Sequence, residues 1–168
     1  MMIAGLLAAL PGSAAGKTPA DPCASFSWNV SHERAVFGEL PQRINAGSSA
    51  EGAPALTARH LYELALLPQS QVRFAIAPGK SPSAESHAGI ATFRVSSAGV
   101  YRIALDQPVW VDVVTNGAAI RSRDFQGRAG CNAPHKIVEF VFPADTPLTL
   151  QFSGAGGSTV RVAVLQAP

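Results

Sequence analysis

The four histidines are the first residues to test for chemistry, because imidazole is the commonest metal ligand among side chains. No two of them have the HxH, HxxxH or HExxH spacing that lets local structure place both side chains on one ion. His135 and Glu139 would face each other on a helix, but a strand holds them roughly 13 Å apart. The sequence therefore predicts no metal site and assigns surface or structural roles to His32, His60, His87 and His135.

Two glycine-containing stretches resemble chemical motifs without completing them. Pro78-Gly79-Lys80-Ser81 resembles the end of a phosphate-binding P-loop, but the earlier glycine of that motif falls at Phe74 and no helix pattern follows. We interpret this stretch as a turn. Gly154 to Ser158 could hold a nucleophile, but a serine elbow leads from a strand into a helix, and this stretch leads into a predicted strand. We interpret it as a hairpin loop and predict no catalytic residue.

The chain has two cysteines, Cys23 and Cys131. In an oxidising compartment an even pair predicts one disulfide, which here would tie the N-terminal segment to the sheet. Because the bond closes a loop of about 100 residues, the chain-entropy model gives it on the order of 4 to 5 kcal/mol. The alternative is a catalytic thiol at Cys131, but the sequence shows no His/Asn arrangement around it that would support this role.

Trp110 is the residue that most suggests a binding site. If the valine face of its strand points into the core, Trp110 and Asp112 share the outer face. A flat aromatic ring beside a hydrogen-bonding carboxylate can hold a sugar or a peptide. The alternative is that the ring is covered by Phe26, Trp28 and the helix that follows them, which need a surface to pack against. Trp110 and Asp112 are the candidate ligand-binding residues, with both interpretations open.

The stretch from Gly99 to Thr115 must position these two side chains. Its first arm alternates with a period of two from Tyr101 to Leu105, and its second arm does the same from Val109 to Val113. Gln107 and Pro108 separate the arms. The pattern predicts a hairpin at the centre of the fold, with both alternating sets facing the core.

The segment from Leu56 to Leu67 is ambiguous, because its composition favours a helix while its leucines and Tyr62 alternate as in a strand. We favour a strand that forms a hairpin with Val72 to Ile76. A short helix is expected between Asn29 and Leu40, since Asn29 or Ser31 can cap its start and Glu33 lies in its first turn. The remaining predicted strands are 90–96, 136–142, 148–152 and 159–165.

Strands joined by short turns, without alternating helices, indicate a mainly β fold. We expect an antiparallel β-sandwich, jelly-roll-like, with one short N-terminal helix. The 168 residues are enough for one domain with its own core. We assign residues 17–55 to a linker and the helix, which packs on the sheet, and residues 56–168 to the sandwich.

Residues 3–10 form a short apolar run that ends at Pro11 and small residues. Spanning a bilayer takes roughly 20 apolar residues, so the run matches a secretory signal instead, with Ser13 and Ala15 directing cleavage after Ala15. No Lys or Arg precedes it, so the signal is atypical or translation starts upstream of Met1. We assign residues 1–16 to the signal and its cleavage zone, and expect a periplasmic or secreted protein with no membrane span afterwards.

The charge of the chain argues against a nucleic-acid partner. The net charge is only +2, and 14% of residues are charged. Arg121, Arg123 and Arg128 form the only local basic cluster, and no ladder of aromatic residues interleaves with it. We interpret this cluster as a solvated loop.

Four stretches of the chain together resemble known proteins. They are Cys23-x-x-Phe26-x-Trp28, Glu33-Arg34-Ala35, Gly99 through Val114, and the second cysteine before His135-Lys-Ile-Val-Glu-Phe140. They look like a family of short exported proteobacterial proteins whose activity is not established. The strand pattern is also similar to bacterial pre-peptidase C-terminal sandwich domains, which are usually accessory modules. Some relatives carry a homogentisate dioxygenase label, which implies iron ligands.

We therefore expect a non-enzymatic, exported binding or interaction module with no cofactor. Its partner would be a carbohydrate, a protein or a peptide, bound on the outer face of the Trp110 strand. The alternative is an enzyme whose site is assembled from distant residues, for example a metal-dependent dioxygenase. The lack of a metal-ligand motif in the sequence disfavours that alternative.

Overall fold

The structure, a computed structural model, describes residues 21–168, and the predicted signal peptide lies outside them. This part of the chain is mainly β and forms two sheets and one α-helix. The first sheet has the order β1-β3-β12-β6-β10-β9. Its strands are β1 (Gln42–Asn45), β3 (Tyr62–Ala65), β12 (Thr159–Gln166), β6 (Gly99–Leu105), β10 (Lys136–Phe142) and β9 (Asp124–Gly127).

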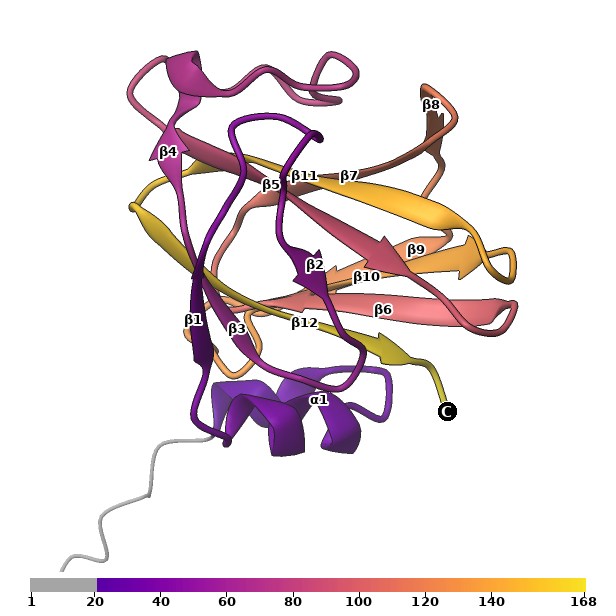
Figure 1. The fold of residues 1–168 in the computed structure, drawn as a ribbon. Helices are drawn as coiled ribbons and strands as arrows, with labels where there is room; N and C mark the ends of the chain where they lie inside the picture. The colour runs from indigo at the N-terminus through magenta and orange to yellow at the C-terminus, as the bar shows by residue number, and fades with distance from the viewer. Residues whose placement is uncertain (1–20) are drawn as a thin grey trace, which may run out of the picture.

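The second sheet has the order β2-β5-β11-β7-β8, with β4 pairing on β5. Its strands are β2 (Ala55–Leu56), β5 (His87–Arg94), β11 (Pro147–Ala155), β7 (Trp110–Thr115), β8 (Ala118–Ile120) and β4 (Leu67–Pro68). The helix α1 spans Ser31–Phe37, and two short 3-10 helices cover Pro22–Ser25 and Gln69–Gln71. The two sheets form two layers, and α1 lies on the side of the first sheet that faces away from the second (Figure 1).

One hydrophobic core receives side chains from both sheets, because each strand turns alternate residues toward the opposite layer. Phe140 and Phe142 of β10 stack with ring centroids 5.6 Å apart, and Phe152 of β11 is fully buried in the same core. The predicted inward faces, Tyr101 to Leu105 and Val109 to Val113, are both confirmed as core.

The predicted hairpin between these two arms is wrong. β6 pairs with β10 and β12 in the first sheet, whereas β7 pairs with β11 and β8 in the second. The residues between them cross from one layer to the other, and Arg161 holds this crossing through two bonds to the Asp106 carboxylate. Two consecutive strands with apolar faces can pair in the same sheet, or they can lie in opposite sheets and face each other across the core. Side-chain alternation is the same in both arrangements, so it does not distinguish them.

The loop after Gly154 is not a hairpin loop either, because β11 lies in the second sheet and β12 in the first. The sheets are mixed rather than antiparallel: β1 runs parallel to β3, and β2 runs parallel to β5. The first of these pairs begins at Gln42, within the range expected to be linker and helix. The basic cluster expected to be a solvated loop contains the short edge strand β9, and the short edge strand β8 ends just before Arg121.

The strand favoured within Leu56 to Leu67 is confirmed at β3. Its predicted hairpin partner, Val72 to Ile76, is wrong, because this segment joins no ladder. Instead the buried Gln151 side chain of β11 accepts bonds from the amides of Ala75 and Ile76 and donates one back to the carbonyl of Ile76. A single amide side chain thus takes the place of a partner strand, and the segment runs over the outer face of the second sheet.

The predicted short helix is confirmed as α1, but its N-cap residue is Val30, which makes no side-chain cap bond. Asn29, one residue earlier, accepts a bond from the Ser31 amide. The helix packs on the outer face of the first sheet, where Val36 and Phe37 join a second apolar cluster. Phe26 and Trp28 pack there as well. The idea that they cover Trp110 is therefore wrong, because Trp110 lies on the outer face of the other sheet.

A charged network lies beneath α1. The guanidinium of Arg102 bonds Glu33 of α1 at 3.0 Å and Glu139 of β10 at 2.9 Å, and all three side chains are buried. The same guanidinium also donates to the carbonyl of Asn29 and lies 4.8 Å from the centre of the Trp28 ring. Arg102 of the first sheet thus contacts the helix, the segment that precedes the helix, and the neighbouring strand β10.

The predicted disulfide between Cys23 and Cys131 is confirmed, with Cα atoms 5.1 Å apart. It fastens the segment before α1 to the turn before β10. Because the sulfur of Cys131 is bonded to Cys23, the alternative of a catalytic thiol at Cys131 is wrong.

Candidate functional site

The outer face of the second sheet carries the predicted site residues. On β7, Trp110 and Asp112 point outward, and on β11 their register partners Ser153 and Gln151 do the same. The segment that Gln151 holds continues over this face toward residue 86, above the second sheet in Figure 1. Near Trp110 the covering is incomplete and leaves a pocket.

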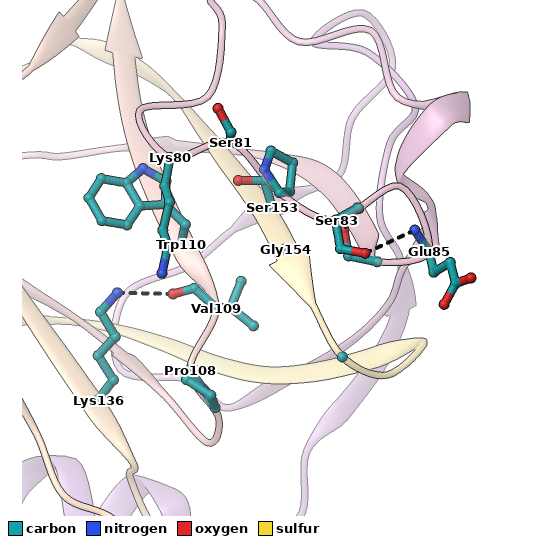
Figure 2. A pocket seen from close by; sticks show the side chains of 13 residues that line it. Lys80, Ser81, Ser83, Glu85, Pro108, Val109, Trp110, Lys136, Ser153 and Gly154 are labelled. Carbon is teal, nitrogen blue, oxygen red and sulfur yellow. Dashed lines mark hydrogen bonds between the residues drawn. The ribbon is translucent and has the colours of Figure 1, made fainter.

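This pocket, the Trp110 pocket, has a volume of about 570 Å³. Ligand sites typically have volumes of roughly 300 to 1,000 Å³. Three parts of the chain form its walls: the loop from Lys80 to Ser86, the start of β7 and the end of β11. Lys136, the first residue of β10, completes the wall from the first sheet (Figure 2). The site is thus assembled from both layers at one end of the fold.

Trp110 presents its ring to the pocket and is 37% exposed. Its indole Nε1 donates to Oδ1 of Asp112 at 2.9 Å, and Oδ2 of Asp112 accepts the amide of Gly79 at 3.1 Å. Each carboxylate oxygen of Asp112 is therefore engaged by the protein. Asp112 fixes the orientation of the ring and anchors the loop, while Trp110 alone of the two predicted residues lines the pocket.

Gly79 allows the loop to approach this closely. A Cβ at position 79 would lie 3.0 Å from Oδ1 of Asp112 and 3.1 Å from the indole nitrogen of Trp110. Contacts this short force the neighbours to move. The Pro78-Gly79-Lys80-Ser81 stretch, interpreted as a turn, bends at Gly79 and Lys80 within a loop, and its glycine allows the close contact with Trp110.

Lys136 is the first residue of β10, and its side chain is on the face of the strand that points toward the second sheet. Because it lies at the end of the strand, its ammonium group reaches the pocket at the edge of the core. Nζ donates to the carbonyl of Val109 at 3.0 Å and lies 5.3 Å from the centre of the Trp110 ring. Burial lowers the pKa of Lys136 first, the charge of Lys80 lowers it further, and Asp112 acts in the opposite direction. In Figure 2 the Lys80 and Lys136 side chains point toward the same space beside Trp110.

Ser153 contributes a hydroxyl group at the base of the pocket. The residue is 1% exposed, and its Oγ has no hydrogen-bond partner among the described residues. A buried hydroxyl without a partner costs roughly 1 to 3 kcal/mol. A polar ligand atom in the pocket would recover that loss, so Ser153 is well suited to contact a ligand.

A smaller cavity of about 120 Å³ adjoins the pocket on the other side of Trp110. Trp110 and Lys136 line both spaces, and Phe125 of β9, which is 65% exposed, lines the smaller one. Two exposed aromatic rings and the Lys136 side chain thus line the smaller cavity together. The surface they form is longer than the pocket alone.

Lys80, Lys136 and Ser153 were not predicted as site residues. They come from a loop, from the first sheet and from the second sheet, and no spacing along the chain relates them. The only available signal was the Gly79-Lys80 pair, which we interpreted as a turn. The histidines stay apart: within residues 21–168, no three His, Cys, Asp or Glu side chains gather into a group able to hold a metal ion.

A scan of protein-family models gives no match for this chain, and a search of curated proteins gives none either. Among the described helices, none has the length and apolar character needed to cross a membrane.

Proposed function

We propose that this protein is an exported, non-enzymatic β-sandwich binding module that holds a carbohydrate in the Trp110 pocket. The observation that carries the proposal is the partly exposed indole ring of Trp110, fixed by Asp112 in the wall of a cavity of ligand size. A ring held in one orientation loses little conformational entropy when a ligand packs against it, which favours binding.

The lining favours a sugar over a peptide. A pyranose ring has an apolar face that packs on an aromatic ring, and hydroxyl groups around its edge that need hydrogen-bond partners. The pocket offers the indole for the first and the hydroxyls of Ser81 and Ser153 for the second. Ser83 and Ser86 also line it, but their hydroxyls already bond within the surrounding chain. A peptide side chain would more often need a deep apolar pocket, and here polar groups surround a single ring.

Export is supported by the disulfide, because such bonds persist mainly in oxidising compartments. N-terminal sequencing of the protein isolated from its host tests this part of the proposal. We expect a mature chain that begins after Ala15. An intact Met1 on a cytosolic, reduced protein would reject export.

A glycan array followed by calorimetry on the best ligand tests the binding proposal. We expect the W110A variant to bind that ligand at least tenfold more weakly while its thermal unfolding midpoint stays close to that of the unmodified protein. L40A removes another exposed apolar side chain, at the end of the helix region, and serves as the matched control with unchanged affinity. Binding of peptides but of no glycan would overturn the proposal.

A further inference from the structure

We propose that the sugar bound in the Trp110 pocket carries a carboxylate, so that the ligand is an acidic oligosaccharide whose uronate group lies between Lys80 and Lys136. This inference rests on the proposed function and names its ligand class. It assigns the two lysines as the residues that distinguish an acidic from a neutral sugar.

The charge around the pocket is the first support. Lys80 and Lys136 both line it, and Glu85 is the only acidic residue in the lining. Asp112 lies behind the indole, with its two oxygens already bonded to Trp110 and Gly79. Neither lysine forms an ion pair within residues 21–168 whose geometry qualifies as a salt bridge. Asp112 offsets part of the charge at Lys136, but neither ammonium group is held by a carboxylate of the described chain, so both can contact an anionic ligand.

The donors left on these lysines are the second support. An ammonium group has three donors, and Nζ of Lys136 uses one of them on the carbonyl of Val109. Two ammonium groups held near each other in a partly buried site repel, and an anion between them removes this repulsion. A carboxylate has two oxygens and can accept from both lysines at once.

The surrounding backbone favours a carboxylate over a phosphate group. Phosphate sites on glycine-rich loops use free backbone amides aimed at the anion. Here the amide of Gly79 is bonded to Asp112, and the amide of Gly154 is bonded to Oε1 of Gln69. The amides of Gly79 and Gly154 are thus occupied by side chains, and the two lysines are the cationic groups of the lining that can bind an anion.

The unpartnered hydroxyl of Ser153 is an independent sign that a ligand belongs in this pocket. Ser153 is the register partner of Trp110, so its hydroxyl lies on the same face of the sheet as the ring. A sugar stacked on the indole would bring its own hydroxyl groups toward Ser153. The adjoining cavity beside Phe125 gives a second aromatic surface beyond Lys136, which suits an oligosaccharide rather than a single sugar.

Calorimetry on the purified protein tests the inference with three uronate tetrasaccharides, from polygalacturonate, alginate and hyaluronan. Each is compared with the same tetrasaccharide after reduction of its carboxyl groups to alcohols. We expect at least one acidic form to bind at least tenfold more tightly than its reduced form. We expect K80M and K136M each to weaken the acidic ligand about tenfold and to leave the reduced ligand unchanged.

R43M is the matched control, because it removes one exposed positive charge from β1, away from the pocket lining, and should leave the affinity unchanged. K80M changes a loop residue and keeps the test valid if K136M alters folding. Equal binding of acidic and reduced forms would overturn the inference and leave carbohydrate binding standing. Tighter binding of a sulfated than of a uronate tetrasaccharide would also overturn it, and the absence of glycan binding would reject both proposals.

Discussion

Lys136 has an unusual position for a charged residue, because it lies on the inward-facing side of a strand whose next inward residues are Val138, Phe140 and Phe142. Its apolar stem can follow the core while the ammonium group reaches the pocket. The carbonyl of Val109 accepts one of its bonds. Burial and the charge of Lys80 both disfavour the ammonium form of Lys136. A bound anion would stabilise that form, which fits a role for Lys136 in anion binding.

The pKa of Lys136 gives a direct prediction. The folded protein should release this proton at lower pH than the ordinary value of 10.5, because burial and then the charge of Lys80 disfavour the ammonium form. NMR titration of ¹³C-labelled lysine side chains measures this. K80M should raise the pKa of Lys136 and D112N should lower it further. A Lys136 pKa that is insensitive to both changes would contradict the described geometry.

The same shift predicts a pH dependence of stability. Between the lowered pKa and 10.5 the unfolded chain holds the Lys136 proton and the folded protein does not. The free energy of unfolding should therefore rise with pH across this window, relative to K136M, which lacks the group. Urea unfolding of both proteins at several alkaline pH values tests this, and a relative fall in stability with rising pH would be the wrong sign.

Trp110 could be chosen from the sequence because strand alternation separates it from the inward valines. Lys80, Lys136 and Ser153 could not, because each belongs to a different element and only the packing of two sheets brings them together. Asp112 was placed correctly beside Trp110, but its bond to the Gly79 amide depends on a loop whose path the sequence does not show.

The docking of α1 depends on Arg102. Glu33 and Glu139 are both buried and bonded to its guanidinium, and Oε2 of Glu33 has no hydrogen-bond partner among the described residues. Removing the arginine would leave two buried carboxylates without a counter-charge. This makes the interface between helix and sheet sensitive to one side chain.

We expect R102M to lower the free energy of unfolding by about 3 to 5 kcal/mol, because breaking a buried ion pair leaves an uncompensated charge. R43M removes an arginine from a pair on the surface with Glu63 and should cost about 0 to 1 kcal/mol. Urea unfolding of the two variants measures the difference. Equal effects would show that the network does not hold the helix.

Several elements were predictable because their signals are local. Helix α1 is preceded by Asn29, whose side chain accepts the Ser31 amide, and is followed by Pro41, and the long strands alternate clearly. The pairing of β6 and β7 with different sheets was not predictable, since it depends on contacts with residues far along the chain. Residues 72–76 alternate like a strand but gain their bonds from Gln151, a side chain about 75 positions away.

The disulfide spans most of the fold, joining residues 108 positions apart. A bond that closes so long a loop mainly restricts the unfolded chain and is worth roughly 4 to 5 kcal/mol in the chain-entropy model. It joins the N-terminal segment to the turn before β10, and neither cysteine lines the Trp110 pocket. Removing the disulfide should therefore lower the stability of the fold and leave the affinity for the ligand unchanged.

We expect the C23A/C131A double variant to lose roughly 4 to 5 kcal/mol of stability against urea. The folded fraction should still bind its ligand with unchanged affinity. Reducing agent should destabilise the unmodified protein and leave the double variant unaffected, which serves as the control. A double variant as stable as the unmodified protein would show that the bond adds nothing to the fold.

The central claim is that a ligand packs against Trp110, and the two tryptophans of the chain allow it to be tested in one sample. Trp28 lies over Arg102 on the outer face of the first sheet, and Trp110 lies on the outer face of the second. ¹⁹F NMR of the protein labelled with 5-fluorotryptophan should show the Trp110 resonance shifting during titration with the acidic tetrasaccharide while the Trp28 resonance stays in place. A titration with measurable binding heat in which the Trp110 resonance does not move would contradict the account.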